Sequence, residues 1–171
     1  MTRVYVPTTL VGLARTQKLG TLDDPDDSGS RLAAHAVTGA VKEWYLEGNL
    51  EELEYSALIE AAEASLRLLA LDPLAPRRRV VVAVDVPEAL VSPGGEHRSS
   101  VRITGPIELS RVVSVHVDEV ESEDTIIAAV DAVDALAAAA GGDDDARFQL
   151  DEAEACDLLW YDISEIDDLI G

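Results

Sequence analysis

Residues 80–86 read Val-Val-Val-Ala-Val-Asp-Val, and this run constrains the fold more than any other part of the chain. Arg77, Arg78 and Arg79 precede it, and Pro87 ends it. A continuous apolar run of this length is typical of a strand in the interior of a sheet. We therefore expect a sheet with this strand inside it. We also expect the three arginines to pair with acids from the C-terminal region.

A long capped helix is the second strong feature. Asn49 followed by Glu52 forms a capping-box pattern, and Asp72-Pro73 ends the helical pattern after Leu71. The polar residues of this segment form one narrow wedge on the helical wheel, so we expect the helix to be buried on several sides. The wedge contains Glu52, Ser56, Glu60, Glu63 and Arg67, and the arc expected to be buried contains Leu58, Ala61, Ala62, Ser65 and Leu69.

Shorter elements complete the prediction. The strands on either side of Gly105-Pro106 are close in sequence, which predicts that they pair with each other in antiparallel fashion. Residues 20–30 and 141–146 are predicted to be exposed acidic loops. The predicted strands cover residues 3–6, 32–37, 101–104, 111–118 and 157–161, and the predicted helices cover residues 9–19, 38–48, 123–140, with Ser122 as its cap, and 165–170.

These elements predict one α+β domain over residues 1–171. We expect a mostly antiparallel sheet of five or six strands with helices mainly on one face. Alternate residues of a strand point to opposite faces, so the valines and isoleucines of the strands share one uniformly apolar face. The other face is polar, and its candidate ligand-binding residues are Arg3, Tyr5, Asp85, Arg102 and His116.

Two interpretations of this polar face remain open. It is either simply in contact with water, as one face of many antiparallel sheets is, or partly covered. In the second case it forms a cleft in which the arginines, Asp85 and His116 converge on a ligand.

The charge of the chain is strongly acidic and unevenly distributed. There are 34 acidic and 13 basic side chains, which gives a net charge of −21. The stretch from Asp118 to Gly171 holds 18 of the acids and one base, Arg147, and so carries −17 of this charge. A field of this sign repels nucleic acids and anionic membranes, so we expect neither as a partner. The same acidity also occurs in salt-adapted proteins, where it serves solubility.

Signatures of known chemistry are mostly missing. The chain has no GxGxxG, P-loop, GxSxG or HExxH motif, and no apolar run approaches the ~18 residues of a membrane span. Its one cysteine, Cys156, forms no internal disulfide, which fits a reducing compartment and predicts a cytoplasmic protein. Residues 24–30 match the first half of a calcium loop, but His35 stands where the loop needs a glutamate. We therefore expect no metal and no cofactor.

The leading hypothesis is a non-catalytic binding or interaction protein that uses the polar sheet face or the acidic C-terminal surface. Its partner would be a small anionic ligand or a protein, a second copy of this chain included. Arg3 and Arg102 favour an anionic group such as a carboxylate or phosphate, because arginine offers a planar fork of donors. Alternatively, these arginines pair with Asp85 and Asp118 across strands.

The second hypothesis is a small enzyme. In this case a carboxylate and a histidine share a pocket on the polar face and act as acid and base. The candidate carboxylates are Asp85 and Glu54, and the candidate histidines are His116 and His35. The sequence leaves open whether the protein is an enzyme.

Six short segments form a distinctive set. They are RVYVPTTL at 3–10, AHAVT at 34–38, EELEY at 51–55, RRVVV at 78–82, SVHVD at 114–118 and LWY at 159–161. Together they resemble a functionally uncharacterised family of short actinobacterial proteins, over nearly the whole chain. This resemblance implies a cytoplasmic protein from a GC-rich bacterium, and it implies no activity, cofactor or catalytic residue.

Overall fold

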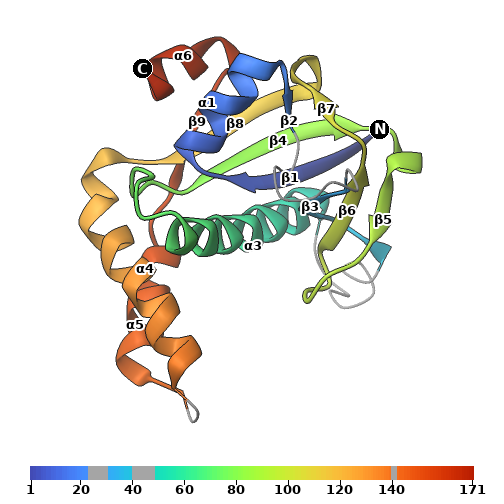
Figure 1. Cartoon of the computed structure of the whole chain (residues 1–171). Helices are drawn as coiled ribbons and strands as arrows, with labels where there is room; N and C mark the ends of the chain where they lie inside the picture. The colour runs from blue at the N-terminus through green and yellow to red at the C-terminus, as the bar shows by residue number, and fades with distance from the viewer. Residues whose placement is uncertain (23–30, 40–48, 140–141) are drawn as a thin grey trace.

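The computed structural model describes residues 1–22, 31–39, 49–139 and 142–171, and its centre is a seven-stranded sheet (Figure 1). Every neighbouring pair of strands is antiparallel, in the order β5-β6-β3-β1-β4-β8-β9. The α+β prediction is confirmed, and the buried run 80–86 is β4, between β1 and β8. The strands are β1 (Thr2–Thr8), β3 (Arg31–Ala36), β4 (Val80–Val86), β5 (Val91–Pro93), β6 (Ser100–Thr104), β8 (Val112–Asp118) and β9 (Leu158–Tyr161).

The seventh strand is β5, which sequence alternation does not reveal because it has only three residues and ends in Pro93. A separate small sheet pairs β2 (Thr21–Leu22) with β7 (Ile107–Glu108). The predicted helix over 38–48 and most of the predicted loop over 20–30 lie outside the described residues. The helices are α1 (Leu10–Leu19), α3 (Leu50–Leu71), α4 (Glu123–Ala138), α5 (Asp144–Glu154) and α6 (Ile166–Ile170), and short 3-10 turns cover Glu88–Leu90, Leu109–Arg111, Val120–Ser122 and Ile163–Glu165.

The predicted apolar face of the sheet forms the largest hydrophobic core. Its valines and isoleucines pack against Leu10 and Leu13 of α1 and against Ile166 of α6. Both helices lie on this side of the sheet in Figure 1. α1 begins after Thr9, whose Oγ1 accepts a hydrogen bond from the Gly12 backbone N–H at 3.1 Å. Thr9 is therefore the N-cap of α1.

α3 covers the other face of the sheet and packs on β1, β3 and β4. Helices thus lie on both faces rather than mainly on one, and the polar face is partly covered, along β1 and β4, as the second of our two interpretations expected. Small side chains allow this close approach of α3 to the sheet. The contact is made by Ala57, Ala61 and Ala62 of α3 against Tyr5, Val81 and Ala83 of the sheet.

The prediction for α3 itself is confirmed. The Asn49 side chain accepts a hydrogen bond from the Glu52 backbone N–H at 2.9 Å, and the helix ends at Leu71. Four of the five residues in the predicted arc are buried, and Leu58 is half-buried. Ser65 also joins the helix to the sheet, since its hydroxyl donates to Thr8 O and accepts from the backbone N–H of Val80.

α4 and α5 form a hairpin that packs on the C-terminal half of α3 (Figure 1). α5 was not predicted, and residues 144–146 of the predicted loop 141–146 belong to this helix. Asp143 caps α5 by accepting from the Ala146 backbone N–H at 3.0 Å, and Asp144 and Asp145 occupy the first turn, where the helix dipole favours acids. α4 does begin after Ser122, but the Ser122 side chain makes no capping hydrogen bond.

The predicted pairing of the strands around Gly105-Pro106 is wrong. β6 pairs with β3 and β5, whereas β8 pairs with β4 and β9, so the two strands lie on opposite sides of β1. The intervening β7 pairs with β2 and does not form part of a tight hairpin. Closeness in sequence was therefore a poor guide to pairing here.

Of the three arginines before β4, only Arg79 pairs with an acid of the C-terminal region as predicted, whereas Arg78 and Arg77 donate to backbone carbonyls. Arg79 forms a bidentate ion pair with Asp118, and its Nη2 also donates to Cys156 O at 3.0 Å. Arg78 Nε donates to Asp118 O, and Arg77 donates to carbonyls at the C-terminus of α3. Within the part of the chain that the structure describes, no helix is long and apolar enough to cross a membrane.

Candidate functional site

The five predicted site residues project from the same face of the sheet, but they do not gather at one point. Arg3 of β1 pairs with Asp85 of β4, with Nε–Oδ1 and Nη2–Oδ2 distances of 2.7 and 3.2 Å. This contact holds the pKa of Asp85 below its usual value and raises that of Arg3. These two residues therefore satisfy each other, as one of our alternatives expected.

Tyr5 and His116 lie deeper on the same face. Tyr5 is only 7 % exposed beneath α3, and burial, followed by the negative charge of Glu54, raises its pKa. His116 Nε2 lies 2.9 Å from Ser114 Oγ, and burial lowers the pKa of this histidine, helped by the charge of Arg3. The ligand-binding role of these residues stays a prediction.

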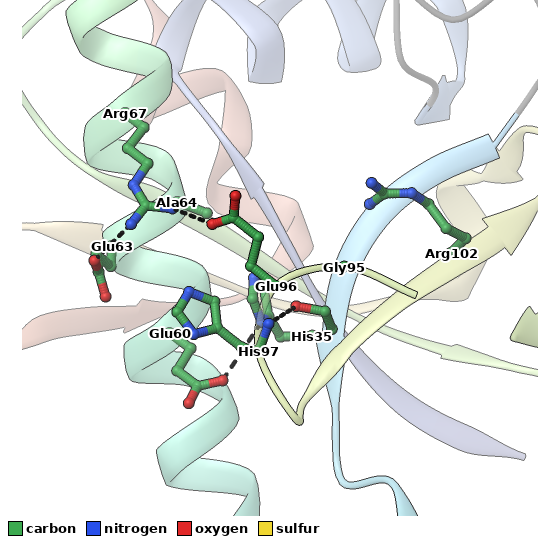
Figure 2. A pocket seen from close by; sticks show the side chains of 10 residues that line it. His35, Glu60, Glu63, Ala64, Arg67, Gly95, Glu96, His97 and Arg102 are labelled. Atoms are coloured by element: carbon green, nitrogen blue, oxygen red, sulfur yellow. Dashed lines mark hydrogen bonds and ion pairs between the residues drawn. The ribbon is translucent and has the colours of Figure 1, made fainter. Parts of the chain in front are cut away.

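Arg102 is separated from the other four and borders a pocket (Figure 2). The pocket has a volume of about 270 Å³ and lies between α3, the turn from β5 to β6, and the strands β3 and β6. We call it the α3 pocket. Its walls are Glu60, Glu63, Ala64 and Arg67 from α3, Gly95, Glu96 and His97 from the turn, and His35, Ser100 and Arg102 from the strands.

The turn between β5 and β6 is held in shape by Gly95 and Ser100. Gly95 has a φ of 132°, a conformation that side chains disfavour, and a Cβ there would lie 2.5 Å from Ser100 Cβ. Ser100 Oγ accepts a hydrogen bond from the backbone N–H of His97 at 3.0 Å. These contacts place Glu96 and His97 opposite α3, as Figure 2 shows.

Two lining residues of the α3 pocket, His35 and Glu60, are connected through the hydroxyl of Ser99. The Ser99 hydroxyl donates to Glu60 Oε2, and Ser99 Oγ lies 2.8 Å from His35 Nδ1. His35 and Ser99 hold the pKa of Glu60 below its usual value, so Glu60 is an ionised acceptor at neutral pH. Because the Ser99 hydroxyl has only one proton, and Glu60 takes it, Ser99 must accept from His35 Nδ1–H.

This arrangement fixes the tautomer of His35. With the proton on Nδ1, the neutral ring has a bare lone pair on Nε2. Nε2 has no hydrogen-bond partner among the described residues, although only 8 % of the side chain is exposed. The ring of His97 lies nearby, with its centroid 6.1 Å from that of His35. A ring nitrogen with an acceptor lone pair thus borders the pocket.

The connected residues His35, Ser99 and Glu60 were not predicted from the sequence as a site. Glu60 belongs to the polar wedge of α3, which looks like a solvent-facing stripe, and Ser99 carries no motif. His35 was considered only as a partner for Asp85 or Glu54 and as a mismatch in the calcium pattern. Nothing in the sequence indicates that β3, α3 and the β5–β6 turn meet, because 25 residues separate His35 from Glu60 and 39 separate Glu60 from Ser99.

No group of three or more histidine, cysteine or acidic side chains with a geometry for metal binding occurs among the residues that the structure describes. The calcium-like segment 24–30 lies outside them.

Comparison with known proteins supports a family but no activity. No curated protein and no solved structure gives a significant match to this chain. A family model described as "Family of unknown function (DUF6912)" matches residues 2–170. The match covers every element of the fold, from β1 to α6. The chain therefore belongs to the family of unknown function DUF6912.

Proposed function

We propose that the protein is a non-catalytic binding protein that holds a small polar molecule in the α3 pocket. The observation that carries the proposal is the pocket itself, whose polar walls are fixed by contacts with one another. Binding sites are commonly concave and present a few oriented polar groups. The pocket uses the polar face of the sheet at β3 and β6, next to the part that α3 covers.

The size and chemistry of the pocket limit what it can hold. A volume of about 270 Å³ is slightly below the range of ~300–1,000 Å³ that is usual for ligand sites, so the ligand is small. Most of the lining side chains are charged, and two are imidazoles, so the ligand is polar. A dinucleotide or a lipid chain does not fit this description.

The proposal also includes the cellular location and the origin of the protein. The single cysteine fits a reducing compartment, so we place the protein in the cytoplasm. The basic residues are 11 arginines and two lysines, a bias that supports an origin in a GC-rich bacterium such as an actinobacterium.

A fragment screen tests the binding function. Mixtures of small polar fragments are added to ¹⁵N-labelled protein, and amide shifts are mapped by NMR. We expect fragments to shift the amides of Gly95, Glu96 and His97. Ala64→Phe fills the pocket and should abolish these shifts, whereas Ala137→Phe adds the same ring at an exposed position of α4 and should not. Absence of any fragment that shifts the turn, or unchanged binding in Ala64→Phe, contradicts the proposal.

Acid–base catalysis is a second candidate, and the His35–Ser99–Glu60 chain is the observation that favours it. In this role His35 Nε2 acts as the proton acceptor, and Glu60 and Ser99 orient the ring through its Nδ1–H. The participating carboxylate is Glu60, not Asp85 or Glu54. Conversion of a bound fragment by the wild type, lost in His35→Asn while binding persists, would favour the enzyme over the binding protein. Bound fragments that stay unchanged favour the binding protein.

A further inference from the structure

Most polar groups of the α3 pocket already satisfy one another. Glu60 is engaged by Ser99 and lies 3.6 Å from His35 Nδ1. Arg67 lies 3.0 Å from Glu63 on α3 and 3.8 Å from Glu96, which reaches toward it from the β5–β6 turn (Figure 2). A ligand that bound to these groups would have to compete with existing contacts.

Three groups have no such partner within the described ranges. The first is the guanidinium of Arg102, whose neighbours across the strands are Ala33 of β3 and Ser92 of β5, neither of them charged. Its guanidinium end points from β6 toward Arg67 and Glu96 (Figure 2). The second is Nε2 of His35, and the third is the imidazole of His97, which contacts the ring of His35 but makes no side-chain hydrogen bond within those ranges. The groups left for a ligand therefore include one cation, Arg102, and the neutral acceptor of His35.

We propose that the α3 pocket binds a small anion that also carries a hydroxyl group, either a hydroxycarboxylate or a hydroxyalkyl phosphate. The inference rests on the proposed function, because it names the ligand class of the same pocket. The anionic oxygens of the ligand take two donors from Arg102, for which the planar guanidinium is suited. The hydroxyl of the ligand donates to His35 Nε2.

The hydroxyl follows from what is left in the pocket. An ammonium group would prefer a carboxylate, but Glu60 is engaged by Ser99, and Glu63 and Glu96 are engaged by Arg67. A neutral imidazole nitrogen suits a neutral donor. Arg102 has no acidic partner among the residues that the structure describes, although the chain has a net charge of −21, and this supports an anionic group as its ligand.

Titration with matched probes tests the ligand class. Glycolate and glycerol 3-phosphate carry both groups, acetate and methyl phosphate carry only the anion, and ethylene glycol carries only hydroxyls. We expect glycolate and glycerol 3-phosphate to shift the amides of the β5–β6 turn. The affinity of glycolate should be at least about threefold higher than that of acetate, and the affinity of glycerol 3-phosphate should exceed that of methyl phosphate by the same factor. The ratio of the affinities of glycolate and glycerol 3-phosphate shows whether the pocket prefers a carboxylate or a phosphate. Ethylene glycol should bind more weakly than both.

Two variants connect the binding to the named atoms. Arg102→Gln should weaken binding of the preferred probe about tenfold or more, because it removes a charge-assisted contact. His35→Asn keeps a donor for Ser99 but removes Nε2, and it should erase the advantage of the hydroxyl probes over acetate or methyl phosphate. Arg147→Gln removes the same charge from an exposed position of α5 and should leave the affinity within about twofold.

The outcomes separate this inference from the proposed function. If neutral or cationic fragments occupy the pocket and the hydroxy anions do not, the ligand class is wrong and the binding function stands. If Arg102→Gln binds the probes as well as Arg147→Gln does, the anion does not use Arg102 and the inference is overturned. If no fragment of any class reaches the pocket, both the function and the inference fail.

Discussion

Arg79 and Asp118 form an ion pair from which water is almost wholly excluded. Their side chains are 3 % and 0 % exposed, and the Asp118 carboxylate accepts from the Arg79 backbone N–H as well as from its guanidinium. The pair connects the start of β4 with the end of β8. Either residue alone would leave a buried charge without a partner, which is far more costly than loss of a surface pair.

The first prediction concerns this pair. Arg79→Met should reduce the free energy of unfolding by about 3–5 kcal/mol. Arg67→Met, which breaks the half-exposed pair with Glu63, should cost less than about 1 kcal/mol. Urea denaturation measures both. Arg79→Met combined with Asp118→Leu should recover much of the loss, and a double variant as unstable as Arg79→Met would contradict the electrostatic explanation.

The second prediction concerns His116. Its pKa in the folded protein lies below the ordinary 6.5, so the unfolded chain takes up the proton first as the pH falls through 6.5. Below pH 6.5 the free energy of unfolding therefore falls as the pH falls, by no more than about 1.4 kcal/mol per pH unit. His116→Gln should therefore lose less stability than the wild type between about pH 7.5 and about pH 5.5. Equal slopes in the two proteins would mean that His116 does not contribute.

At the scale of single elements, sequence patterns predicted the ends and the buried arc of α3 but not the contacts of its polar side chains. The Asn49 cap and the breaker at Asp72-Pro73 predicted its ends, and the wheel predicted its buried arc. The pattern could not show that Glu60, inside the polar wedge, turns toward His35 and Ser99. A helical wheel describes one element, whereas the role of Glu60 depends on what lies opposite it.

The third prediction tests the buried arc of α3. Leu69 is completely buried, so Leu69→Ala should reduce the free energy of unfolding by about 2–5 kcal/mol, through lost burial and the cavity that remains. The matched control is Leu71 on the same helix, which is 81 % exposed. Leu71→Ala should change the free energy of unfolding by less than about 0.5 kcal/mol. Similar losses in the two variants, measured by denaturant titration, would mean that the helix is packed differently.

At the scale of the whole molecule, strand order is what the sequence did not contain. Alternation placed the valines on one face and Arg3, Asp85 and Arg102 on the other, and the registers confirm this. It gave no order across the sheet, so we predicted one cluster of polar residues. In the structure β3 lies between Arg102 and β1, and the pocket forms where β3, β6 and α3 meet.

The fourth prediction concerns the acidic C-terminal part of the molecule. Within the described residues, Asp118 is the only acid between 118 and 171 for which an ion pair is found. Mutual repulsion among the others should be screened by salt, so raising NaCl from about 0.01 M to about 0.15 M should raise the melting temperature. Replacing the exposed Asp151, Glu152 and Glu154 of α5 by amides should reduce this salt effect. A melting temperature that is constant or falls with salt would contradict it.

The central claim is that the Glu60–Ser99–His35 chain leaves a bare Nε2 in the α3 pocket. Long-range ¹H–¹⁵N NMR correlations of the histidine rings, recorded at about pH 8, where a histidine of ordinary pKa is neutral, report the tautomer directly. The structure predicts that His35 carries its proton on Nδ1, and that Ser99→Ala or Glu60→Gln weakens this preference. A wild-type His35 with its proton on Nε2 would contradict the account, because the pocket would then offer a donor where we propose an acceptor.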